Sequence, residues 1–260
     1  MQNSKIPVHT IPDIIEGIII RRPSKIIKSP YVADVQIAGE EKLAHCPSLG
    51  LCGMIVPGSL VFMSLNQTKT KTDYKVHAVL VNERESKTNF TPSGDVIVGC
   101  DPILSNKIGK KLFFDHVDYF HPITSHKQEF TFKESRFDHY FESNDQKYYV
   151  EIKSVPTCNF CFDDEFLSNP ANKTLIRDLK KRCYEEHASI DSFQRKAIFP
   201  DGYKKNKTAS VSERANKHIQ ELTEVAKLGE VNPYLCFFVM RNDCYQFQQT
   251  LFVNHLLKQN

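Results

Sequence analysis

Two carboxylates and a lysine near the middle of the chain are the residue types of a metal-dependent hydrolytic site. They are Asp138, Glu151 and Lys153, with Glu129 as a third carboxylate upstream. Carboxylate oxygens, completed by water and a substrate phosphate, suit Mg²⁺ or Mn²⁺. The ion would polarise a phosphoryl group, and the lysine would orient the attacking water or neutralise developing charge. This set therefore favours hydrolysis of phosphate esters.

The residues around this set alternate between apolar and polar types, as in an antiparallel hairpin. Asn144 and Asp145 are turn residues that tolerate positive φ. If they form a two-residue loop, Asp138 lies opposite Glu151 on the same face of the sheet. Two negative charges directly opposite each other on neighbouring strands destabilise a sheet unless a positive charge compensates them. The sequence therefore predicts that these carboxylates share one cation. The alternative is an ordinary amphipathic hairpin with a solvated charged face.

Four ordered blocks of the sequence resemble the sugar fermentation stimulation protein family (SfsA). They are HCPSLG at His45–Gly50 with the later Pro57-Gly58, SRFD at Ser135–Asp138, YVEIKSV at Tyr149–Val155 and IFPD at Ile198–Asp201. The resemblance covers most of the chain and implies an α/β (α+β) fold. An N-terminal OB-like β-barrel, residues 1–82, would precede a PD-(D/E)XK restriction-endonuclease-like domain with a mixed central sheet, residues 83–260. It also implies binding to DNA or RNA and metal-dependent nuclease activity.

The family pattern implies roles for further residues. It has a glutamate before the SRxD block, for which Glu129 is preferred over Glu134. Its R-G-x-K-H block is matched by Arg214, Lys217 and His218, although alanine replaces the glycine here. These three residues lie on a helix that a capping box begins and that should end before a glycine. We expect them to hold the phosphate backbone; the alternative is a solvated helix face.

The rest of the chain yields a coarse map of elements. Before residue 83, short apolar stretches separated by glycine and proline favour a small barrel. Pro102–Lys111 is a candidate helix, and the apolar run Pro233–Met240 is typical of a buried central strand. Asn242–Asn260 is expected to be a loop and a final helix.

Basic side chains elsewhere are candidates for contacts with nucleic acid. Arg21 and Arg22 on the predicted barrel and Arg136 on the hairpin would contact phosphates, and His45 would border the substrate groove. For the two barrel arginines, a solvated charged edge is an equally good interpretation. The formal net charge is only +3, so a nucleic-acid-binding surface must be local.

A segment inserted relative to the family, about residues 156–196, contains a second candidate metal site. Cys158, Cys161, Cys183 and His187 form two ligand pairs with the spacing of a tetrahedral zinc site. The alternative is cysteines that pack as small apolar residues or are simply exposed. No signal peptide or transmembrane segment is recognisable, so we expect reduced cysteines, a cytoplasmic or nuclear location and no membrane partner.

The function that the sequence favours is a metal-dependent nuclease. The first alternative is a non-catalytic DNA-binding regulatory protein that retains a relict nuclease site. A structural interaction module is the second, but it leaves the basic helix face unexplained. Nothing in the sequence indicates an oligomeric state.

Overall fold

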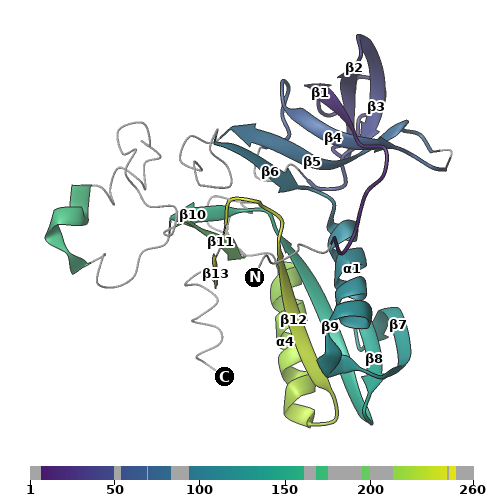
Figure 1. Cartoon of the computed structure of the whole chain (residues 1–260), viewed down its shortest axis with the longest axis vertical. Coiled ribbons are helices and arrows are strands. Elements are labelled where there is room, and N and C mark those ends of the chain that lie inside the picture. The colour runs from purple at the N-terminus through teal and green to yellow at the C-terminus, as the bar shows by residue number, and fades with distance from the viewer. Residues whose placement is uncertain are drawn as a thin grey trace, which may run out of the picture. The chain divides into compact units, whose positions relative to one another are not determined.

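The computed structural model describes residues 7–49, 54–68, 70–82, 94–160, 168–174, 195–199, 213–244 and 246–249. The chain divides into two compact units. Unit 1 comprises Met1–Asp13, Asp101–Ser154 and Tyr203–Phe238, and unit 2 comprises Ile14–Cys100, Val155–Gly202 and Val239–Asn260. The protein is a mixed α+β protein in which sheets dominate both units (Figure 1).

Unit 2 contains a six-stranded sheet in the order β3-β2-β1-β4-β5-β6. Its strands are β1 (Ile15–Arg21), β2 (Val32–Ile37), β3 (Glu40–His45), β4 (Leu60–Leu65), β5 (Tyr74–Asn82) and β6 (Asp95–Gly99). The short strands and turns expected before residue 83 are therefore present. In addition, β3 pairs with β5 in parallel at Ala44↔Tyr74 and His45↔Lys75.

The core of this sheet consists of aliphatic side chains. Val35, Val61, Val76 and Val79 are completely buried in one cluster. On β4, alternate residues are buried, as expected of a strand with one face toward a core. Burial of these side chains therefore stabilises the sheet through the hydrophobic effect.

Unit 2 also contains a small three-stranded sheet in the order β10-β11-β13. Its strands are β10 (Cys158–Phe160), β11 (Arg195–Phe199) and β13 (Gln246–Gln249). The strand β13 lies where the sequence predicted a loop and final helix, so that prediction is wrong for these residues. Its polar composition offers no apolar periodicity by which the strand could be recognised.

Unit 1 contains a four-stranded sheet in the order β12-β9-β8-β7. Its strands are β7 (Ile123–Phe132), β8 (Ser135–Ser143), β9 (Gln146–Val155) and β12 (Asn232–Val239). The run predicted to be a buried central strand is β12, which lies at the edge of this sheet and is half-buried. The apolar run identified a strand but not its place in the sheet.

Two helical layers cover opposite faces of the unit 1 sheet. On one face, the π-helical turn Leu112–His116 packs on Phe141, Tyr148 and Val150, and helix α1 (Pro102–Lys111) brings Gly109 against Ile152. On the other, helix α4 (Glu213–Leu228) packs on neighbouring residues of the same strands, among them Tyr140 and Tyr149. Adjacent residues of a strand point to opposite faces, which separates the two clusters.

The start of helix α1 and the end of helix α4 agree with the sequence, whereas the residues before Glu213 lie outside the described residues. Helix α1 has the predicted bounds, and its N-cap Asp101 accepts a hydrogen bond from the Ile103 amide at 3.2 Å. Helix α4 ends before Gly229, whose φ of +71° closes the helix. Among the described residues, no helix combines the length and apolar character needed to cross a bilayer.

Candidate functional site

The hairpin that carries the candidate carboxylates has the predicted register. Strands β8 and β9 pair antiparallel from His139↔Val150 to Ser143↔Gln146. The two loop residues, Asn144 and Asp145, have φ values of +49° and +60°. A loop with two positive φ values matches the twist of a tight hairpin. The turn prediction is therefore confirmed.

Side chains on β7 and β8 nevertheless change faces near the candidate site. Phe141 packs in the cluster on the α1 face, whereas Phe137, four residues away, packs in the cluster on the α4 face. Strict alternation would place both on one face. The same shift occurs on β7, where Glu129 has a φ of +55°. The faces of residues before this point therefore cannot be deduced from the hairpin register.

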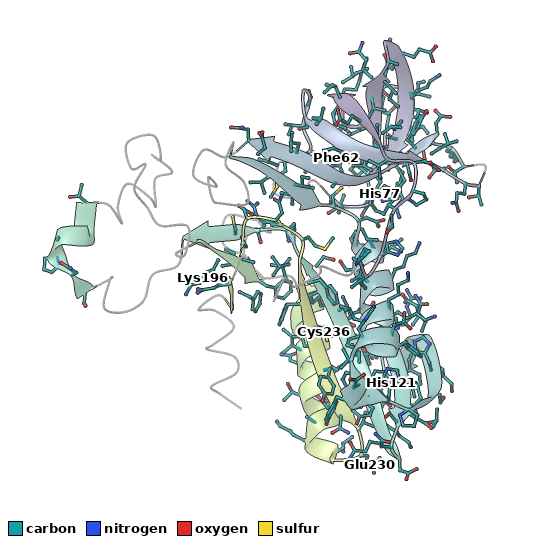
Figure 2. The ribbon with its side chains drawn as sticks, in the orientation of Figure 1. Phe62, His77, His121, Lys196, Glu230 and Cys236 are labelled. Carbon is teal, nitrogen blue, oxygen red and sulfur yellow. The ribbon has the colours of Figure 1, made fainter. Side chains whose placement is uncertain are left out.

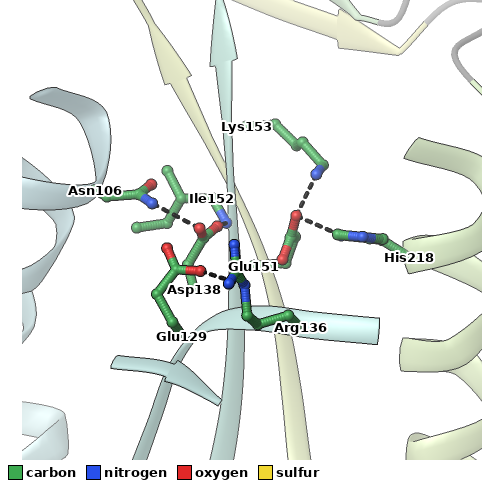
Figure 3. A network of polar contacts seen from close by, with 8 residues as sticks. All are labelled: Asn106, Glu129, Arg136, Asp138, Glu151, Ile152, Lys153 and His218. Carbon is green, nitrogen blue, oxygen red and sulfur yellow. Dashed lines mark hydrogen bonds and ion pairs between the residues drawn. The ribbon is translucent and has the colours of Figure 1, made fainter. Parts of the chain in front are cut away.

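The Glu151 carboxylate lies on the α4 face of β9. Its Oε1 accepts a hydrogen bond from His218 Nδ1 at 2.6 Å and another from Lys153 Nζ (Figure 3). Glu151 is 3% exposed, and its Oε2 is buried without a hydrogen-bond partner among the described residues. Glu151 and Lys153 thus share a face, as the alternation of β9 predicts.

Asp138 makes its contacts on the side of α1. Its Oδ1 accepts a hydrogen bond from Asn106 of α1 at 2.6 Å, and its Oδ2 accepts one from the Ile152 amide at 2.7 Å. Figure 3 shows Asp138 near Asn106, and Glu151 reaching toward His218 instead. The prediction that Asp138 and Glu151 share a face is therefore wrong, because the alternation shifts beside Asp138.

The two carboxylates differ in the hydrogen bonds that their oxygens accept. Asp138 bonds to Asn106 of α1, whereas Glu151 bonds to His218 of α4. Both Asp138 oxygens accept hydrogen bonds. No three ligand atoms from this part of unit 1 lie within 4.8 Å of one another among the described residues. That Asp138 and Glu151 share a cation stays a prediction. Of these two carboxylates, Glu151 has an oxygen, Oε2, that is buried without a hydrogen-bond partner among the described residues.

The other two predicted hairpin residues pair with each other. Glu129 Oε2 lies 2.6 Å from Arg136 Nε, and both side chains are largely exposed. An exposed ion pair contributes little to stability. The arginine therefore has an acidic partner, whereas the sequence had assigned it to phosphate.

The helix residues assigned to phosphate binding are divided between two environments. Lys217 lies on the surface of α4, where its Nζ donates to Glu134 at 2.9 Å. His218 is buried, and its Nδ1 bonds to Glu151 Oε1 at 2.6 Å. The Arg214 side chain lies outside the described residues.

The remaining predicted contacts with nucleic acid lie in unit 2. Arg21 pairs with the buried Asp34 at 3.0 Å, and Arg22 donates to the backbone carbonyl of Pro30 at 2.7 Å. His45 ends β3 and is half-buried. Both arginines are therefore held by groups of unit 2 itself.

The predicted zinc ligands can be followed only in part. Cys158 begins β10, whereas Cys161, Cys183 and His187 lie outside the described residues. Cys158 lies beside two other candidate ligands that the sequence analysis did not single out, Asp243 and Cys244. Asp243 and Cys244 are far from Cys158 in the sequence, so no motif of closely spaced ligands indicates this group.

A basic pocket on α1 was also missed. It has a volume of about 440 Å³ and is lined by three exposed lysines, Lys107, Lys110 and Lys111, together with His9, Phe114 and Asp115. Lys110 lies one helical turn beyond Asn106, the helix partner of Asp138. The spacing of the three lysines on the predicted helix was the available signal.

Comparison with known proteins agrees with the resemblance seen in the sequence. Residues 103–166 and 164–255 match the family model described as "Sugar fermentation stimulation protein RE domain". A "Sugar fermentation stimulation protein homolog" of Desulfitobacterium hafniense is 27% identical over 239 residues, covering 90% of this chain and 77% of the relative. A homolog from Pelagibacter ubique is 29% identical over 230 residues, covering 87% and 74%.

A solved structure extends the agreement to the fold. It is that of Pyrococcus furiosus SfsA in complex with Ca²⁺, which matches with a TM-score of 0.66 and 18% identity. The match covers 98% of this chain and 87% of that one. On the strength of the family model, the chain belongs to the sugar fermentation stimulation protein family.

Proposed function

We propose that this protein is a Mg²⁺- or Mn²⁺-dependent nuclease that hydrolyses phosphodiester bonds of DNA or RNA. The observation that carries the proposal is the Glu151 carboxylate. It is buried, is held at one oxygen by Lys153 and His218, and has no partner at the other in the part of the chain that the structure describes. A buried acceptor without a donor is costly unless a ligand satisfies it.

Glu151 Oε2 would be the protein's ligand to the cation. Magnesium is commonly held by one or two carboxylates, with waters and substrate phosphates completing its shell. When bound, the ion would lower the pKa of a water and polarise the phosphoryl group. Lys153 and His218 fix the carboxylate by occupying Oε1, and Lys153 also places a positive charge near the reacting phosphate. Asp138 is assigned a positioning role, because its oxygens hold Asn106 and the β9 backbone.

The substrate's backbone would be bound at the basic pocket on α1. Lys107, Lys110 and Lys111 supply positive charge, and Phe114 supplies an aromatic ring on which a base could stack. This assignment replaces Lys217 and His218, whose side chains already have carboxylate partners. The pocket lies on the helix that contacts Asp138, on the face of the sheet opposite Glu151, so it would hold a flanking part of the substrate and not the phosphate that is cut.

The finer fold assignment is part of the same proposal. The six-stranded sheet with its additional β3–β5 pairing is the candidate for an OB-like barrel. The four-stranded sheet with one helical layer on each face is the candidate for the PD-(D/E)XK core. An OB-like barrel would suit single-stranded substrates.

The test is cleavage of labelled single- and double-stranded DNA and RNA with Mg²⁺, Mn²⁺ or EDTA. Wild type should cut only with a metal, and Glu151→Gln and Lys153→Ala should each lose roughly a hundredfold or more in rate. Glu230→Gln is the matched control, because it removes one negative charge, as Glu151→Gln does, at an exposed residue after α4. Metal-dependent cutting that survives Glu151→Gln would overturn the proposal.

A DNA-binding regulatory protein with a relict site is the second candidate. It is favoured by one observation: Glu151 already has two donors at Oε1, and both Asp138 oxygens are bonded. The Asp138 carboxylate and Glu151 Oε1 therefore have protein donors and need no cation, and only Glu151 Oε2 lacks a donor among the described residues. Binding of nucleic acid without metal-dependent cleavage would establish this alternative.

A further inference from the structure

Three potential metal ligands from two distant parts of the chain meet in unit 2. They are Cys158, Asp243 and Cys244, and one ligand atom from each lies within 4.8 Å of the other two. Asp243 is completely buried and both cysteines are half-buried. We propose that these three residues bind a structural Zn²⁺ ion. The ion would be separate from the catalytic cation discussed above.

The distances suit a tetrahedral ion. Zinc lies about 2.3 Å from thiolate sulfur and about 2.0–2.2 Å from carboxylate oxygen, so two ligand atoms are separated by roughly 3.5–3.8 Å. Cys244 Sγ lies 3.7 Å from Asp243 Oδ1. All three ligand atoms lie within 4.8 Å of one another, so the side chains need to move only slightly inward to bind an ion. A water molecule or a further side chain would complete the fourth position.

Arg241 holds the carboxylate ligand in place. Its Nε and Nη2 donate to the two Asp243 oxygens, each at 2.9 Å, and both side chains are at most 1% exposed. Outer-shell bonds of this kind orient metal ligands. Two thiolates and Asp243 carry three negative charges, and Zn²⁺ and Arg241 carry three positive ones. A loaded site would therefore be neutral, as burial requires.

The position of the site suggests why the chain would need an ion there. Cys158 begins β10 and Cys244 lies just before β13, while β11 separates these two strands in the sheet. The three strands have only three, five and four residues. Such a small sheet buries little apolar surface, and a metal that joins its outer strands would stabilise it.

The site shares one residue with the zinc site that the sequence predicted, namely Cys158. The two differ in a way that mutation can separate, because only the structure brings in Cys244 and Asp243. The predicted partners Cys161 and Cys183 belong to the insertion. Their substitution should leave most of the zinc bound if the three-residue site is correct.

The experiment measures the metal content of the full chain after dialysis against Zn²⁺ and then against buffer. Wild type should retain stoichiometric zinc, and Cys158→Ser and Cys244→Ser should each lose most of it. Cys236→Ser is the matched control, because Cys236 lies on β12 in a different cluster (Figure 2). The readout is independent of cleavage, so failure of the nuclease proposal would not affect it.

A second measurement covers variants that fail to fold. Replacing zinc by Co²⁺ in the wild-type chain should produce the charge-transfer absorption of a cobalt–thiolate bond. The zinc proposal fails if wild type takes up neither metal, or if its two thiols form a disulfide instead. It also fails if Cys244→Ser keeps its zinc while Cys161→Ser and Cys183→Ser lose it, since that result would establish the site predicted from the sequence.

Discussion

The backbone N–H of Ile152 donates a hydrogen bond to Asp138 Oδ2 at a distance of 2.7 Å. The carboxylate thus takes the position of a strand carbonyl beside β9, just beyond the last paired residues, His139 and Val150. Its other oxygen accepts from Asn106, so one side chain joins β8, β9 and α1. Asp138 therefore has a structural role in unit 1 that does not depend on the proposed activity.

Replacing this carboxylate should lower stability in proportion to the hydrogen bonds lost. Asp138→Ala leaves the Ile152 amide and the Asn106 side chain without their acceptor, so we expect the free energy of unfolding to fall by about 1–3 kcal/mol. Asp138→Asn keeps one oxygen for the Ile152 amide and should lose less. Urea denaturation followed by circular dichroism measures both. Equal losses in the two variants would contradict the role assigned to this hydrogen bond.

The sequence was sufficient for local structure around this site but not for the faces of its strands. Turn chemistry at Asn144 and Asp145 correctly predicted the hairpin register. The shift of alternation was not predictable, because Glu129 adopts positive φ without being a residue type that favours it. The Cys158–Cys244 contact depends on tertiary folding and has no local signal.

The buried contact between Glu151 and His218 should contribute to the stability of the α4 layer. His218→Ala would leave the carboxylate with Lys153 alone, so we expect a loss of about 1–3 kcal/mol in the free energy of unfolding. His218→Asn places an amide donor near the position of Nδ1 and should recover part of that loss. Urea denaturation of both variants measures these losses. The m-values should not differ from that of wild type. A loss below about 0.5 kcal/mol in His218→Ala, the range of ordinary surface changes, would contradict the contact.

Acid should destabilise unit 1 through a pair of histidines on the α1 face. His126 Nε2 lies 3.1 Å from His139 Nδ1. Burial, together with the charges of His139 and Lys110, lowers the pKa of His126 to about 4. Burial also lowers the pKa of His139.

The sign of the effect follows from proton uptake. The unfolded chain protonates these histidines below a pH of about 6.5, whereas the folded protein resists protonation of His126 until about pH 4. The unfolded state thus binds more protons in this window, and stability falls as the pH decreases through it. His126→Gln should reduce the fall in Tm between pH 6.5 and 4, and the exposed His116→Gln should not. Equal pH dependence in both variants would rule out His126 as a major source.

The basic pocket on α1 should dominate the electrostatic part of nucleic-acid binding. Joint substitution of Lys107, Lys110 and Lys111 by alanine removes three charges from one helix. We therefore expect weaker binding of a single-stranded oligonucleotide, with a salt slope reduced by about 2, because each phosphate contact contributes about 0.7 to that slope. Fluorescence anisotropy at several salt concentrations measures both quantities, with EDTA present to prevent cleavage.

A variant of equal charge controls for net electrostatic attraction. Joint substitution of Lys133, Lys147 and Lys227 by alanine removes three exposed lysines of unit 1 that lie in the β7–β8 turn, on β9 and on α4. If the pocket is the binding surface, this variant should bind nearly as tightly as wild type and keep its salt slope. If both triple variants weaken binding equally, only long-range charge is acting, and the pocket on α1 is not where the phosphates bind.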